Sequence, residues 1–90
     1  MIWDKKLVNG GVQIIHRFAN DFGASIVKHN FSYGHEDGLW ELAVIRFKDY
    51  DSWFIDYSTA ITNDVIGYLS DKDVKKILKK IEKLDKSTEM

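Results

Sequence analysis

The segment with the most chemistry in this sequence is residues 32–38, which carries a histidine, two carboxylates, a tyrosine and two glycines. His35 could exchange a proton near neutral pH, with Glu36 and Asp37 beside it. General acid–base catalysis needs a second group held rigidly within reach, and adjacent residues in a glycine-containing loop do not hold such geometry. We therefore interpret this segment as either a hairpin connection or a partner-binding loop, and we expect no catalytic residues.

Three histidines raise the question of a metal site. His16 and His29 fall on neighbouring expected strands, and His35 lies beside two carboxylates, which is a donor set that zinc accepts. However, no pair of histidines stands four residues apart, and the chain has no cysteine. The sequence therefore favours partly buried histidines with hydrogen-bond partners, and it predicts neither a metal nor a cofactor.

Aromatic residues make up 13% of the chain, which is a surplus for one small core. Tryptophan and tyrosine are favoured anchors of protein interfaces, so some of them are expected at a partner surface. The equal alternative is that they fill the core beneath a helix. The candidate binding residues selected from the aromatics and the acidic loop are Tyr33, His35, Glu36, Asp37, Trp40, Tyr50 and Trp53.

Charge is distributed unevenly along the chain. Residues 70–90 hold seven basic and five acidic side chains, whereas residues 1–69 hold six basic and nine acidic ones. A lysine-rich helix could follow a phosphate backbone, but dedicated nucleic-acid binders show a much stronger basic patch. With a formal net charge of -1, the lysines are best interpreted as a solvated helix face, and nucleic acid is not an expected partner.

Turns in this chain must be made by glycine, asparagine and aspartate, because proline is absent. Between the turn clusters lie four runs rich in β-branched and aromatic residues, which predict strands. Their loops are of a length that suits an antiparallel meander. The third run is the most apolar, so it is the expected central strand, with both faces partly covered. The predicted strands are residues 12–18, 24–31, 39–47 and 53–57.

The last third of the chain changes to helical periodicity. Thr62 can cap a short helix over residues 63–69, although a glycine inside it weakens that prediction. Ser70 and Asp73 predict a capping box at the start of a second helix over residues 71–84. An apolar stripe on this helix is expected to pack on one face of the sheet. The stripe comprises Val74, Ile77, Leu78, Ile81 and Leu84.

These patterns predict one α+β domain: a four-stranded antiparallel sheet, a short helical turn and a C-terminal amphipathic helix on one face. Ninety residues suit a single domain. No apolar run approaches the roughly 20 residues that span a bilayer, and no signal-peptide pattern follows the N-terminus. We therefore expect a cytoplasmic protein that does not contact a membrane, and the lack of cysteine suits that reducing compartment.

Four segments carry a resemblance to a known group of proteins. They resemble small uncharacterised accessory proteins of tailed bacteriophages and prophages, and the resemblance covers most of residues 12–84. It implies a short protein in the cytoplasm of an infected bacterial host, and it carries over no catalytic residue. The segments are Phe22-Gly23-Ala24-Ser25-Ile26-Val27, Ser32-Tyr33-Gly34, Leu39-Trp40-Glu41-Leu42-Ala43-Val44 and Asp64-Val65-Ile66-Gly67-Tyr68-Leu69.

The function expected from these observations is that of a non-enzymatic protein that occupies or blocks a host macromolecule, most readily a host protein. By analogy with phage accessory proteins, this includes a counter-defence inhibitor of the anti-CRISPR kind. Two alternatives stay open: sequestration of a small nucleotide signal, and weak binding of single-stranded nucleic acid by sheet aromatics and helix lysines. Homodimerisation through exposed apolar sheet surface is compatible with all three.

Overall fold

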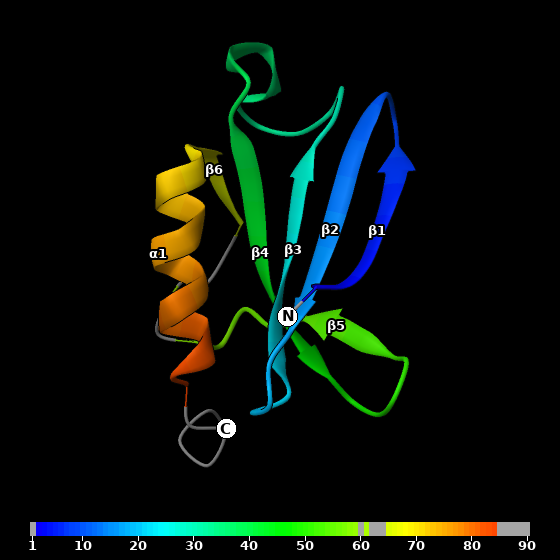
Figure 1. The fold of residues 1–90 in the computed structure, drawn as a ribbon, viewed down its shortest axis with the longest axis vertical. Helices are drawn as coiled ribbons and strands as arrows, with labels where there is room; N and C mark the ends of the chain where they lie inside the picture. The colour runs from blue at the N-terminus through cyan, green and yellow to red at the C-terminus, as the bar shows by residue number, and fades with distance from the viewer. Residues whose placement is uncertain (1, 60, 62–64, 85–90) are drawn as a thin grey trace.

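A computed structural model of the chain describes residues 2–59, 61 and 65–84. It confirms the α+β class, with an antiparallel sheet and one C-terminal helix (Figure 1). The described residues form six strands, two more than predicted. In chain order the elements are β1 (Ile2–Val8), β2 (Gly11–Arg17), β3 (Phe22–Lys28), the 3-10 turn η1 (His35–Asp37), β4 (Trp40–Phe47), β5 (Trp53–Ile55), β6 (Ile66–Leu69) and α1 (Asp71–Glu82).

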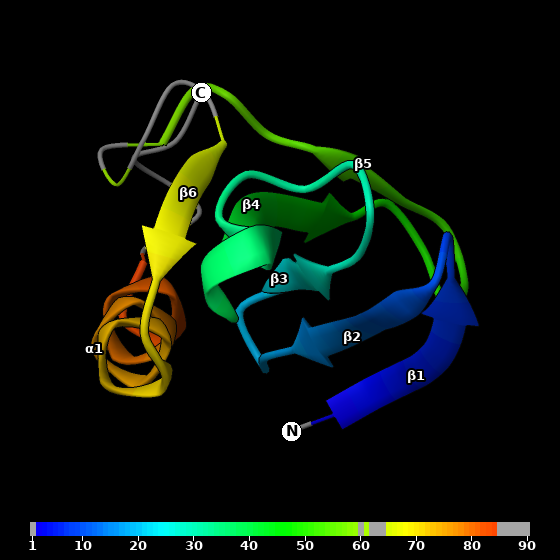
Figure 2. The same cartoon turned by 90° about the horizontal axis from the view of Figure 1, so that it is seen from above.

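Strand β4 pairs with β3, β5 and β6. Strands β1 to β5 follow one another as an antiparallel meander, as predicted for the four strands from β2 to β5. The second edge of β4 is shared, because residues 45–47 pair with β5 and residues 40–42 pair with β6. Figure 2 shows α1 and β6 together at one side of the molecule and the β1–β2 hairpin at the other.

The sequence patterns do not predict β1. Its middle carries Asp4, Lys5 and Lys6, and every residue before Val8 is exposed, so the strand lacks an apolar alternation. It forms because Asn9 and Gly10, with φ of 46° and 80°, make a two-residue turn of the kind that directs two strands into a hairpin. Charged side chains on such an edge strand discourage pairing with another chain.

The predicted short helix over residues 63–69 is wrong where the structure describes it. Ile66–Leu69 form strand β6, which pairs with the start of β4. Residues 62–64, with the predicted cap Thr62, lie outside the described residues. The local apolar spacing suits a helix, but Gly67 weakens one, and pairing with an open edge of β4 prevails.

The apolar core lies in two layers, one on each face of β4. Leu42 and Val44 face α1, whereas Ile45 and Phe47 alternate to the opposite face. The prediction that both faces of the central strand are covered is therefore confirmed. The layer beneath α1 also contains Phe22, Ala24, Ile26, Leu69, Val74 and Ile81, and the smaller opposite layer contains Ile15 and the half-buried Trp53.

The N-terminal end of α1 has the predicted capping box. Ser70 Oγ accepts a bond from the Asp73 backbone N–H at 3.1 Å, and the Ser70 backbone N–H donates to Asp73 Oδ2 at 3.1 Å. Hydrogen bonding of the Asp73 carboxyl to the Ser70 backbone N–H, and then to the Ser70 side chain, holds the pKa of this carboxyl below its usual value. Trp40 Nε1 donates to Asp71 Oδ1 at 2.7 Å, which fastens this helix end to the start of β4. No helix among the described residues is long and apolar enough to cross a membrane.

Asn20, in the turn between β2 and β3, closes the other end of α1. Its Nδ2 donates to the carbonyl oxygens of Ile81, Glu82 and Leu84 at 2.9, 3.1 and 2.9 Å. Its Oδ1 accepts from the Phe22 backbone N–H at 3.0 Å. Carbonyls in the last turn of a helix have no donor within the helix. The two N–H donors of one side-chain amide are thus shared among the three carbonyls and join the turn to the helix.

We expect Asn20→Ala to lower the free energy of unfolding by about 1–3 kcal/mol, because the carbonyls at the end of the helix lose the side-chain donor that they share. Chemical denaturation measures this change. The matched control is Asn30→Ala: Asn30 is exposed, and its side chain makes no hydrogen bond among the described residues, so a change within about 0.5 kcal/mol is expected. Equal losses in the two variants would contradict the role assigned to Asn20.

Ile81 is 0% exposed, whereas Ile77 and Leu78 are only partly buried on the same stripe. We expect Ile81→Ala to reduce the free energy of unfolding by about 2–5 kcal/mol through lost transfer energy and the cavity left behind. The same truncation at Ile77 or Leu78 should cost less. Denaturation curves of the three variants test this order, and a larger loss at Ile77 than at Ile81 would show that the helix is oriented differently.

Candidate functional site

The turn η1 and strand β6 enclose a pocket of about 260 Å³ at one end of the sheet. In Figure 1, η1 lies beyond the first residues of β4, the end of the strand where β6 pairs. We call this cavity the Tyr33–Tyr68 pocket. Its lining consists of Ser32, Tyr33, Gly34, His35, Glu36, Asp37 and Tyr68.

Two glycines allow the segment before η1 to lie directly against β6. A Cβ atom on Gly67 would stand 2.6 Å from Tyr33 Cβ, and a Cβ atom on Gly34 would stand 3.0 Å from Tyr68 Cα. The first separation is shorter than atoms tolerate, and the second is very tight. The pocket therefore depends on the close approach of these two glycines, each to the tyrosine of the other segment.

Hydrogen bonds hold the same two segments in place. The Tyr33 backbone N–H donates to Glu41 Oε1 at 3.2 Å, and the Tyr33 carbonyl accepts from the Tyr68 backbone N–H at 3.5 Å. His35 Nδ1 lies 3.0 Å from the Ser32 carbonyl oxygen. A carbonyl can only accept, so Nδ1 carries the proton in this contact, and Nε2 is the acceptor of the neutral ring.

Tyr68 occupies an unusual backbone position. The register of β6 against β4 places Gly67 and Tyr68 together opposite Glu41, which makes a β-bulge. Tyr68 has φ of 58°, in the left-handed region that a bulky side chain rarely adopts. The residue is nevertheless 62% exposed, so the core gains little from its ring. Strain of this kind often lies at functional sites, which makes Tyr68 a candidate site residue.

Four of the seven residues predicted as binding residues line the pocket: Tyr33, His35, Glu36 and Asp37. Both carboxylates are exposed, and neither makes an ion pair within the described part of the chain. The patterns in the sequence do not select Tyr68, because they assign its segment to a helix. Its position in the pocket depends on the register of β6 against β4, which no local pattern in the sequence specifies.

The other three predicted residues lie elsewhere. Trp40 has a structural role, since its Nε1 donates to Asp71 and its ring makes a cation–π contact with Lys28, whose Nζ lies 4.2 Å from the ring centroid. With a rise of about 3.3 Å per residue, the two ends of β4 lie about 23 Å apart. Tyr50 and Trp53 follow the end of β4 that is opposite to the pocket. Trp53 packs on the smaller apolar layer, and Tyr50 is 85% exposed in the loop before β5. The seven residues therefore do not form one site.

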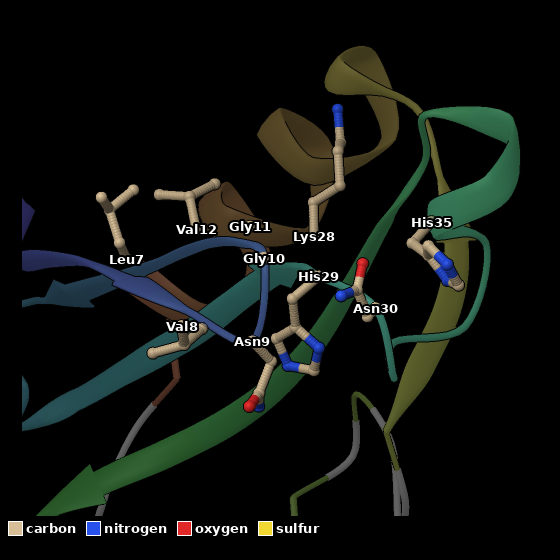
Figure 3. Close-up of a pocket in the computed structure, with 10 residues that line it drawn as sticks. All are labelled: Leu7, Val8, Asn9, Gly10, Gly11, Val12, Lys28, His29, Asn30 and His35. Atoms are coloured by element: carbon tan, nitrogen blue, oxygen red, sulfur yellow. The ribbon is translucent and has the colours of Figure 1, made fainter.

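A larger and more open pocket of about 790 Å³ lies at the tip of the β1–β2 hairpin. Figure 3 shows Lys28 pointing toward the α1 side of the sheet and His29 pointing to the opposite side. The Lys28 ammonium lies over the Trp40 ring, and His29 Nδ1 accepts from the Phe31 backbone N–H at 3.1 Å. Lys28 is the one lysine or arginine among the residues that line this pocket. Its ammonium contacts the Trp40 ring, which is not part of the lining. The pocket is thus poorly equipped to bind an anion.

The histidines do not gather into a cluster. Within residues 2–59, 61 and 65–84, no group of three or more histidine, cysteine, aspartate or glutamate side chains is placed to hold a metal ion. His16, on β2, stacks with Phe18 at 6.3 Å between ring centroids. Burial lowers the pKa of the His16 imidazole, which favours its neutral form. His16 therefore belongs to the packing of the sheet rather than to the pocket.

No family model matches the chain, and no curated protein or solved structure matches it either. The chemistry of the Tyr33–Tyr68 pocket therefore follows from its own residues. They provide two exposed phenol rings, two carboxylates without ion pairs and no lysine or arginine. This combination suits binding of a partner group better than it suits a chemical step.

We expect Tyr68→Asn to raise the free energy of unfolding by about 1 kcal/mol, because asparagine tolerates a positive φ and the exposed ring contributes little burial. Thermal denaturation followed by circular dichroism measures this gain. Tyr57→Asn is the matched control, since Tyr57 is 51% exposed and has no positive φ, and it should show no gain. Equal losses of stability in the two variants would mean that the Tyr68 ring supports the fold.

Proposed function

We propose that the protein is a non-enzymatic binding protein of phage type that occupies or blocks a host macromolecule through the Tyr33–Tyr68 pocket. The observation that carries this proposal is the exposed ring of Tyr68 on a strained backbone. Glycine or asparagine would fit this position at lower free energy. A contact between the ring and a partner accounts for a residue that the fold itself does not favour.

The geometry of the polar groups supports binding over catalysis. The Nδ1 atom of His35 is directed at the Ser32 carbonyl, not at the carboxylate of Glu36 or Asp37. Both carboxylates stand in water, whereas catalytic sites exclude solvent around the reacting groups. Tyrosines at the rim of a concave site are instead typical anchors of protein interfaces.

The biological context of the proposal comes from the sequence resemblance to phage accessory proteins. On that analogy the protein acts in the cytoplasm of an infected bacterium, its partner is a host protein, and its specific role is counter-defence inhibition of the anti-CRISPR kind. Nothing in the geometry of the pocket selects one host target over another.

The geometry favours a protein partner over the two alternatives. A nucleotide needs cations at its phosphates, but the Tyr33–Tyr68 pocket has carboxylates, and Lys28 in the larger pocket lies over the Trp40 ring. Single-stranded nucleic acid needs aromatics and cations on one surface. The helix lysines lie on α1, which covers one face of the sheet, while Trp53 packs in the layer on the other face.

The test is affinity capture from nuclease-treated bacterial lysate with the tagged protein as bait. The wild type and Tyr50→Ala should retain the same host protein, whereas Tyr33→Ala and Tyr68→Asn should lose it. Truncation of a central interface aromatic costs about 2 kcal/mol or more, which is roughly thirtyfold in affinity. Tyr50 is a matched control because it is also exposed but lies at the opposite end of β4.

Two outcomes would contradict the proposal. One is capture of the same protein by Tyr68→Asn as by the wild type. The other is recovery of the bait alone, combined with a solution mass by light scattering that falls from dimer to monomer in Tyr68→Asn. In that case the pocket would be an interface between two copies of this chain.

A further inference from the structure

The Tyr33–Tyr68 pocket has the form of a slot for one side chain. Its volume is about 260 Å³, which is just below the lower end of the range of about 300–1,000 Å³ typical of small-molecule sites. Tyr33 lies against Gly67, so its ring is fixed to β6 at its base while 60% of the residue stays exposed. Tyr68 is fixed in turn by the bulge. The slot is therefore bounded by two exposed tyrosines, and the approach of Gly67 to Tyr33 and the bulge at Tyr68 set the positions of their backbones.

The charge of the slot is negative. Glu36 and Asp37 are the charged residues of its lining, both are exposed, and neither is neutralised by an ion pair among the described residues. His35 Nδ1 lies 3.0 Å from the Ser32 carbonyl oxygen, so in the tautomer that donates from Nδ1 the acceptor of the ring is Nε2. Phenol faces, carboxylates and a ring nitrogen acceptor all attract a cation with N–H groups.

We propose that the Tyr33–Tyr68 pocket binds an arginine side chain on the surface of the partner protein, an inference that rests on the proposed function. A guanidinium is planar, stacks on aromatic faces and donates two parallel bonds to a carboxylate. A lysine ammonium supplies the charge but neither the plane nor the paired donors.

The test uses the full-length protein labelled with ¹⁵N and the probe Nα-acetyl-arginine amide, followed by two-dimensional NMR. Amide signals of residues 32–38 and 66–69 should shift and saturate, while those of the loop before β5 stay in place. The matched probes are the citrulline analogue, which keeps the shape but lacks the charge, and the lysine analogue. We expect the citrulline probe to bind roughly tenfold more weakly than the arginine probe, with the lysine probe between them.

Variants show whether the assigned groups make the contact. Tyr68→Asn, and the double variant Glu36→Gln with Asp37→Asn, should each weaken the arginine probe roughly tenfold. The control double variant is Asp49→Asn with Asp51→Asn, which removes two exposed carboxylates at the opposite end of β4 and should leave binding unchanged. Equal binding of the citrulline and arginine probes, or unchanged binding in the Glu36 and Asp37 double variant, would overturn the proposal.

The two proposals fail in distinguishable ways. If Tyr68→Asn abolishes capture of the host protein but the arginine probe causes no shifts, the pocket contacts its partner through another group, and only the arginine inference is wrong. If the probe binds as expected but Tyr68→Asn captures the host protein normally, the pocket recognises arginine without serving the proposed interface, and the proposed function is wrong.

Discussion

The burial of both faces of β4 is the constraint on which the rest of the structure depends. Leu42 and Val44 need one apolar layer and Ile45 and Phe47 need another, but a single helix can cover only one face. The second layer is built with Ile15 of β2 and Trp53 of β5, whereas β6 adds Leu69 to the layer beneath α1. The second edge of β4 is accordingly divided between β5 and β6. That division places β6 at the start of β4, beside the segment that leads into η1, and the pocket forms where the two meet.

At most positions of the pocket the residue type suits the backbone conformation that the fold requires, and at one position it does not. Glycine at positions 34 and 67 is what the close approach of the two segments requires. Tyrosine at position 68 is not, because the bulge imposes a positive φ on a bulky residue. Conflicts of this kind are expected where a sequence serves binding as well as folding, since stability and activity place different demands on one residue.

The parts of the fold that could be predicted are those encoded within a few neighbouring residues. The capping box of Ser70 and Asp73, the apolar stripe of α1 and the apolar runs of β2 to β5 are local patterns of this kind. The loop before β4 is indicated by its glycines and polar residues. Strand β1 could not be predicted, because its charged residues are held by pairing with β2 and not by burial. Tyr68 could not be selected either, since its backbone conformation arises from the register of β6 against β4.

The amide of Asn20 also bears on the order in which the molecule assembles. Its three carbonyl acceptors lie 61, 62 and 64 residues further along the chain, whereas the hairpins from β1 to β4 join strands adjacent in sequence. Contacts across such distances form late, because closing a long loop costs more conformational entropy. A helix of 12 residues is marginal in water on its own. Helix α1 therefore depends on docking against the sheet for its stability, and the Asn20 amide joins its last turn to the β2–β3 hairpin.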